Sequence, residues 1–206
     1  MSFIIGRKIK MDQLWNKDGK VVPVTYVQAG PVVVTQVKTK DHDGYDAFQV
    51  GYDTTVKAKR VSKSVQGHLK DLGKFRFLKE FRKTSDTQAY AKGDTIAVSA
   101  FAEGDRLKVT GIEKGRGFQG VVKRHGFHGG PKTHGQKNRL RAPGSLGPTA
   151  PQRVMKGKKM AGRMGNETVS IKGIRIITID AEKNIFALKG PLPGNNRTIL
   201  LIQKEQ

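Results

Sequence analysis

The feature that most constrains the fold is a run of 53 residues, 114–166, that contains no Asp or Glu. It carries 13 Lys or Arg, three His, 12 Gly and four Pro. Its few apolar residues recur with neither the period of a helix nor that of a strand. A segment without an apolar face cannot form a core, and it is far longer than the usual ~4–6 residues of a connection. We therefore expect 114–166 to fold against something other than this chain.

The charge of the whole chain indicates what that partner is. The 206 residues include 39 Lys or Arg against 17 Asp or Glu, a formal net charge of +22. Such a chain repels itself unless a polyanion offsets the charge. Nucleic acid is favoured over an anionic membrane surface as the partner. A solvated surface would mix acids with bases, so the missing acids point to phosphate contact.

Other classes are excluded by composition. The chain has no Cys, which rules out disulfides and thiolate zinc sites. No run approaches the ~20 apolar residues of a membrane span, and the first residues do not resemble a secretion signal. We expect a soluble, unprocessed chain that acts on no membrane.

The remaining sequence predicts a mainly β fold. Short strand-like stretches, VVPVTYVQ, PVVVTQVKT and YDAFQVGY, follow one another in the first fifty residues, and the pair Asp18-Gly19 marks a hairpin. Strand patterns resume in DTIAVSAF and RLKVTGIE, and again in TVSIKGIRIITID, NIFALKG and RTILLIQ. No helix of crossover length separates the first strands, which favours a small antiparallel barrel over a doubly wound sheet.

Residues 59–93 differ from the strands around them. KSVQGHLKDLG predicts a short helix ended by Gly73, with Val65, Leu69 and Leu72 on one face. FRFLKEFR, which follows, has the alternation of a strand. We expect a small α+β insertion here.

The stretch GRGFQG, 115–120, fits the glycine pattern of dinucleotide-binding loops. That function needs a following helix and an acid about 20 residues later, but Gly and Pro soon follow and the first later acid is Glu167. Two interpretations stay open. The glycines permit positive φ at a strand bend, or they let the backbone approach phosphates between Lys114, Arg116, Lys123 and Arg124.

Catalytic and metal sites find no support. His125, His128 and His134 have no acid or Cys nearby to complete a metal site, and contact with RNA is the better interpretation. Ser145 has no neighbouring carboxylate for a catalytic triad. We expect no enzyme, no cofactor, no metal and no small-molecule substrate.

The predicted RNA-binding residues lie within or beside the acid-free run, which ends in the basic cluster KGKKMAGRMG, 156–165. Lysines neutralise phosphate as point charges, and arginines bind it bidentately or stack on bases. We expect recognition of folded RNA by shape, chiefly through its backbone. The predicted contacts are Lys114, Arg116, Gly117, Lys123, Arg124, His125, His128, Lys132, His134, Lys137, Arg139, Arg141, Arg153, Lys156, Lys158, Lys159 and Arg163.

Taken together, the opening IIGRKIKMDQLWNKDGKVVPVTYVQAGPVVVTQVKT, the stretch GIEKGRGFQGVVKRHGF, and PGSLG followed by KGKKMAGRMGNE carry a family resemblance. The chain resembles the bacterial form of the large-subunit ribosomal protein three (L-three) family over essentially its full length. The resemblance implies a six-stranded barrel of the translation-protein type, a small inserted module, and a long irregular basic extension. It implies a barrel from 1–58, 94–124 and 166–206, an insertion at 59–93, and an rRNA-penetrating loop at 125–165.

The resemblance also implies partners and a place of action. Members bind the 3′ region of large-subunit (23S-type) rRNA early in assembly, in the cytoplasm, and contact neighbouring large-subunit proteins, commonly fourteen and nineteen. They extend a tip toward the peptidyl transferase centre. In this chain the tip residues are Gly144, Ser145, Gly147, Gln152 and Arg153. Some bacterial members carry a methylated glutamine near the tip, for which Gln152 is the local candidate.

This chain departs from the family pattern in places. Lys108 stands where Asp or Asn is usual, Glu113 stands where Ser or Thr is usual, and the tip between GSLG and KGKKMAG is one residue short. Local contacts are expected to differ there. A free basic RNA chaperone, or a protein that coats nucleic acid, has the same composition and stays open as an alternative function.

Overall fold

The computed structural model describes residues 2–15, 19–55, 61–70, 72–83 and 89–205. The chain forms two compact units. Unit 1 consists of residues 1–112 and 168–206, and unit 2 consists of residues 113–167.

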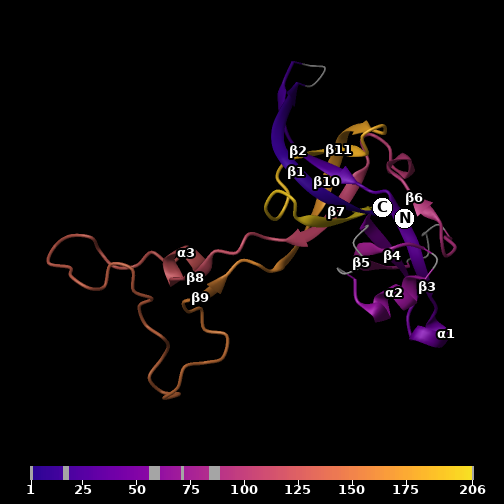
Figure 1. Cartoon of the computed structure of the whole chain (residues 1–206). Helices are drawn as coiled ribbons and strands as arrows, with labels where there is room; N and C mark the ends of the chain where they lie inside the picture. Colours follow the sequence, from indigo (N-terminus) through magenta and orange to yellow (C-terminus); the bar gives the residue numbers. More distant parts are fainter. Residues whose placement is uncertain (1, 16–18, 56–60, 71, 84–88, 206) are drawn as a thin grey trace. The chain divides into compact units, whose positions relative to one another are not determined.

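Six strands of unit 1 close into an antiparallel barrel in the order β1-β12-β7-β10-β11-β2 (Figure 1). Each strand pairs with two neighbours, so the barrel leaves no open edge where its strands are paired. The strands are β1 (Phe3–Trp15), β2 (Val21–Ala29), β7 (Arg106–Ile112), β10 (Thr168–Asp180), β11 (Ile185–Lys189) and β12 (Ile199–Lys204). The prediction of a mainly β fold is confirmed.

Period-two alternation explains how these sequences form a barrel. In β7, Leu107 and Val109 are fully buried, whereas Lys108 between them is only partly covered. Leu200 and Ile202 of β12 are likewise fully buried. Alternate side chains of a strand point to opposite faces, so these four fill the interior while their neighbours face outward.

The second sheet of unit 1 has four strands in the order β5-β4-β3-β6. The first residue of β1 joins it to the barrel, because the Phe3 ring stacks on Phe48 at 5.8 Å and on Phe81 at 4.6 Å between centroids. Both sheets therefore share one hydrophobic core. The strands are β3 (Val32–Lys38), β4 (Ala47–Thr54), β5 (Phe75–Arg82) and β6 (Thr95–Ile96), and the helices of this unit are α1 (Lys40–Asp43), α2 (Lys63–Leu69) and the 3-10 turn η2 (Val98–Ala100).

Three strands, β3, β4 and β6, lie in a different sheet from the one that the sequence predicts. Residues 1–58 and 94–124 were assigned to the barrel, but β3, β4 and β6 within them pair in the four-stranded sheet. Alternation predicts that a strand forms, not which strand it pairs with. The chain leaves the barrel at Gly30, whose φ of +59° and whose close approach to the Ile4 side chain only glycine accommodates.

Two further predictions, a short helix and a hairpin, can be compared with the structure of unit 1. The helix expected to run to Gly73 ends at Leu69. The expected hairpin is formed, since β1 and β2 pair out to Trp15 and Val21, although Asp18 itself lies outside the described residues. Parts of the expected insertion, 59–60, 71 and 84–88, lie outside them as well.

Unit 2 contains little regular structure. Its elements are β8 (Gly117–Gln119), α3 (Val121–His125) and β9 (Gly162–Met164). Residues 126–161 form neither helix nor strand (Figure 1). This agrees with the missing apolar periodicity.

Candidate nucleic-acid interface

A short two-stranded ribbon forms the base of unit 2. In it β8 pairs with β9, from Gly117 opposite Met164 to Gln119 opposite Gly162. The backbone amide of Arg116 also donates to the carbonyl of Met164 at 2.9 Å. The first and last parts of the acid-free run are thus held side by side.

Glycine is required at position 165, where the last part of the acid-free run lies against the first part. Gly165 is buried and has a φ of +75°, and a Cβ there would lie 2.2 Å from the carbonyl oxygen of Lys114. Any larger residue would separate the two parts. This contact places Lys114, one of the predicted RNA-binding residues, beside the ribbon.

Helix α3, which follows β8, contacts the chain just before β9. The guanidinium of Arg124 donates to the carbonyl of Met160 at 2.8 Å, and a ring nitrogen of His125 lies 3.0 Å from the same oxygen. The helix ends at Gly126, whose φ of +73° gives a left-handed cap. Arg124 and His125 therefore position the backbone as well as supplying charge.

The glycine motif GRGFQG, 115–120, contains β8 and leads directly into α3. The helix has five residues and is a little over one turn long. Gly117 adopts a φ of +69°, so one glycine serves a backbone bend, as one of the two open interpretations requires. The other interpretation, close approach of the backbone to phosphates, stays a prediction.

All residues predicted to contact RNA lie in unit 2, and most are exposed. Arg124 and His125 are the half-buried ones among the charged side chains. Glu113 and Glu167 are the carboxylates of this unit, and both lie at its ends. The ion pairs formed among described residues all lie in unit 1. Among the described residues, the 13 Lys and Arg of the acid-free run thus have no carboxylate partner, and all of them except the half-buried Arg124 are exposed.

The predicted tip forms two turns. The Ser145 hydroxyl lies 3.3 Å from the carbonyl oxygen of Gly147, and the amide of Gln152 donates to the carbonyl of Thr149 at 3.0 Å. Gln152 has a φ of +50° and is exposed, as is Arg153. The turns present both side chains to solvent.

The histidines do not gather into a metal site. Across the described residues, no three His, Cys, Asp or Glu side chains lie close enough to hold an ion. His125 is engaged with a backbone carbonyl, and His128 and His134 are exposed on the irregular loop.

The loop between α3 and the tip borders an open, solvent-accessible cavity of about 620 Å³. Phe127, His128, Gln136 and Arg139 are among its lining residues. Phe127 and Gln136 are not among the residues that the sequence predicts to contact RNA. Neither is charged, so the charge pattern that marked the other residues carried no signal for these two.

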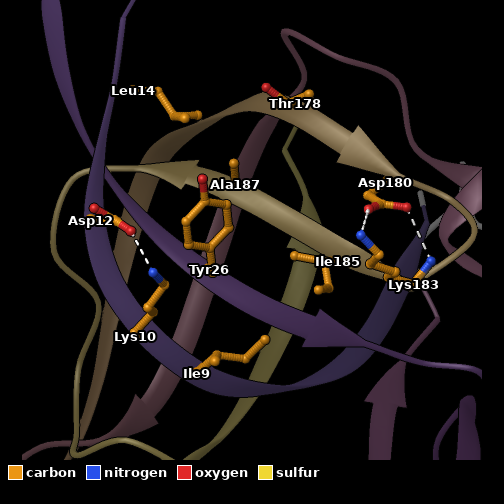
Figure 2. A pocket seen from close by; sticks show the side chains of 10 residues that line it. All are labelled: Ile9, Lys10, Asp12, Leu14, Tyr26, Thr178, Asp180, Lys183, Ile185 and Ala187. Atoms are coloured by element: carbon orange, nitrogen blue, oxygen red, sulfur yellow. Dashed lines mark hydrogen bonds and ion pairs between the residues drawn. The ribbon is translucent and has the colours of Figure 1, made fainter.

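Figure 2 shows a second cavity, of about 480 Å³, on the barrel. At its rim Lys10 pairs with Asp12 at 2.6 Å and Lys183 with Asp180 at 3.8 Å. Hydrogen bonding with Asp12 raises the pKa of Lys10, and the same bond lowers the pKa of Asp12. These cations are already matched by carboxylates, which would repel a phosphate. The apolar lining is formed by Ile9, Leu14, Tyr26, Ile185 and Ala187.

Comparison with known proteins identifies the family. The family model of ribosomal protein L3 matches residues 86–190. The large ribosomal subunit protein uL3 of Dehalococcoides mccartyi is 51% identical over 202 residues, which cover 98% of this chain and 97% of that protein. The chain belongs to the ribosomal protein L3 family.

Other relatives carry the same name. The uL3 protein of Herpetosiphon aurantiacus is 48% identical over 203 residues, which cover 98% of this chain and 95% of the relative. That of Chloroherpeton thalassium is 46% identical over 205 residues, with 98% of each chain covered. The resemblance drawn from the sequence is confirmed.

The L3 family consists of ribosomal proteins, which are structural and not enzymes. In bacteria the ribosome is a cytoplasmic particle. None of the helices in the described part of the chain is long and apolar enough to cross a bilayer.

Proposed function

We propose that this chain is a structural constituent of the large ribosomal subunit and that unit 2 binds large-subunit rRNA. One observation carries the proposal: 13 exposed or half-buried Lys and Arg stand on a loop whose two carboxylates lie at its ends. In a free surface this arrangement is unfavourable, because like charges repel without compensation. A phosphate backbone supplies the missing counter-charge.

Two kinds of contact perform the binding. Lys156, Lys158 and Lys159 neutralise phosphates as point charges, whereas Arg139 and Arg141 donate paired hydrogen bonds or stack on bases. Residues 126–161 form neither helix nor strand, and we expect this segment to order further on the RNA. Counterion release offsets the cost of that ordering.

The finer features of the L3 family extend the proposal. The barrel is of the translation-protein type, 59–93 belongs to its insertion, and 125–165 penetrates the rRNA. The chain binds the 3′ region of the rRNA early in assembly and contacts large-subunit proteins fourteen and nineteen. The tip from Gly144 to Arg153 supports rRNA near the peptidyl transferase centre, where peptide transfer is RNA chemistry. Gln152 is the candidate for methylation, which the mass of the 142–153 peptide from native ribosomes would report.

The decisive experiment measures binding of the purified chain to the 3′ domain of large-subunit rRNA across a range of salt. An equal length of unrelated structured RNA serves as the competitor. We expect a preference on the order of a thousandfold, within the usual span of specific over non-specific binding, and its loss on deletion of 125–165. Equal affinity for both RNAs would reject the proposal and leave a basic RNA chaperone or coating protein.

A further inference from the structure

The irregular loop of unit 2 folds back on itself beside the open 620 Å³ cavity. The amide of Gly130 donates to the carbonyl of Leu140 at 3.0 Å. A Cβ at Gly129 would lie 2.2 Å from that same oxygen, and one at Gly130 would lie 2.8 Å from the carbonyl oxygen of Arg139. Residues 129–130 and 139–140 of the loop thus meet backbone to backbone, and this close approach requires glycine at 129 and 130.

The side chains around the cavity have the chemistry of base recognition. Phe127 and Gln136 are half-buried, so both are partly held in place by the loop. An aromatic ring and a planar guanidinium, here Phe127 and Arg139, are surfaces on which nucleobases stack. The amide of Gln136 both donates and accepts hydrogen bonds, as the edge of a base requires.

Other ligands fit this lining less well. A free phosphate would gain nothing from Phe127 and the prolines Pro131 and Pro143, which also line the cavity. Ca²⁺ or Mg²⁺ would need carboxylates, which the lining lacks, and zinc would need three or four His, Cys or carboxylate ligands, of which the lining offers His128. The volume lies within the ~300–1,000 Å³ typical of small-ligand sites, which is ample for one base with its sugar.

We propose that this cavity takes a single unpaired nucleobase of the bound RNA, stacked on Phe127 and hydrogen-bonded to Gln136. The inference rests on the proposed function, since it assigns to one part of unit 2 the reading of a base in addition to phosphate contact. Single-stranded bases splayed out of folded RNA are the usual targets of such pockets.

The test is ultraviolet crosslinking of the full chain to large-subunit rRNA, followed by digestion and mass spectrometry. A base stacked on Phe127 leaves a nucleotide remnant on the tryptic peptide 125–132. Phe127→Leu removes the ring and should abolish that crosslink while weakening RNA affinity about tenfold, as expected for one lost stack. Gln136→Glu, which places a carboxylate in the cavity, should weaken affinity by a similar factor.

Phe118→Leu is the matched control. Phe118 lies in the same unit, is 77% exposed and does not line the cavity, so its replacement should leave the 125–132 crosslink intact. Crosslinks elsewhere in unit 2 but none on 125–132 would overturn the base pocket and leave RNA binding standing. If the wild-type chain does not bind large-subunit rRNA specifically, the proposed function itself is overturned.

Discussion

Lys8 is a charged residue that the barrel buries. Its side chain is 8% exposed, and its Nζ donates to the carbonyls of Leu192 at 2.7 Å and Gly194 at 3.1 Å. Its backbone amide and carbonyl also bond to Thr198 and Arg197. One residue of β1 therefore fixes the connection between β11 and β12. The sequence gives no sign of this, because a lone lysine in a basic chain looks like any solvated charge.

Lys8→Met keeps the length of the side chain and removes its donors. Two carbonyls of buried residues then lose a charged partner, which should cost about 2–4 kcal/mol of unfolding free energy. Urea denaturation measures the loss as a lower midpoint. Lys10→Met is the control, because Lys10 is exposed, and its ion pair with Asp12 and its contact with the face of the Tyr26 ring replace no buried backbone hydrogen bond. Equal midpoints for the two variants would contradict the role given to Lys8.

Glu80 makes the stability of the second sheet depend on pH. Hydrogen bonds from Tyr45 at 2.7 Å and from Lys38, whose ion pair is 3.0 Å long, lower the pKa of Glu80. A carboxyl group whose pKa is lower in the folded state stabilises the fold above its unfolded pKa of about 4.3. That contribution is lost as pH falls through the folded value.

Glu80→Gln should therefore narrow the difference in unfolding free energy between pH 6 and pH 3. Thermal melts of the wild type and the variant at both values give the comparison. Glu182→Gln, an exposed carboxylate on the turn after β10, should leave the difference unchanged. If the Glu80→Gln protein keeps the wild-type difference in unfolding free energy between pH 6 and pH 3, Glu80 is not the cause of that difference.

At the scale of elements, Gly51 shows how closely β4 and β5 meet. The ring of Phe75 in β5 lies against it, so that a Cβ would stand 2.4 Å from two ring atoms. Gly51→Ala must displace a ring that is 4% exposed, an overpacking change of about 1–3 kcal/mol. Gly67→Ala in α2 should act in the opposite sense, raising stability by about 0.5–1 kcal/mol, because nothing lies within 4 Å. Chemical denaturation of both variants tests the pair, and a destabilised Gly67→Ala or a neutral Gly51→Ala would refute it.

The same elements show where sequence reasoning succeeds. The pattern of β-rich stretches separated by turn residues predicts strands at 21–28, 31–39 and 45–52, where β2, β3 and β4 form. It could not assign the last two to the second sheet, since pairing depends on contacts such as Phe3 with Phe48 across 45 residues of chain. In unit 2 the missing acids mark the candidate interface, which stays a prediction, but the cavity depends on how Gly130 meets Leu140, which no local pattern encodes.

At the scale of the whole molecule, charge is divided unevenly between the units. Unit 2 holds 13 Lys or Arg and two carboxylates, a net charge of +11 in 55 residues. Unit 1 holds the other 26 and 15, which gives the same +11 over 151 residues. Unit 1 can therefore offset part of its charge with internal ion pairs, whereas the charge of unit 2 is offset by RNA phosphates if the proposed function holds.

Salt should consequently act in opposite directions on the free protein and on its RNA complex. Screening weakens self-repulsion, so the melting temperature of the free chain should rise with ionic strength. Affinity for rRNA should fall, with a log–log slope of roughly −6 for about eight phosphate contacts. Replacing Lys156, Lys158 and Lys159 by Ala should flatten that slope by about two units.

The control for this triple variant is an equal change of charge in unit 1, at the exposed lysines Lys20, Lys92 and Lys189. Both triple variants remove three charges, so any effect of net charge alone is common to them. Only contact of 156–159 with RNA makes the slope flatter in the Lys156, Lys158 and Lys159 variant than in the control variant. If the two slopes agree, the phosphates are bound elsewhere, because a slope counts the counterions that each contact releases.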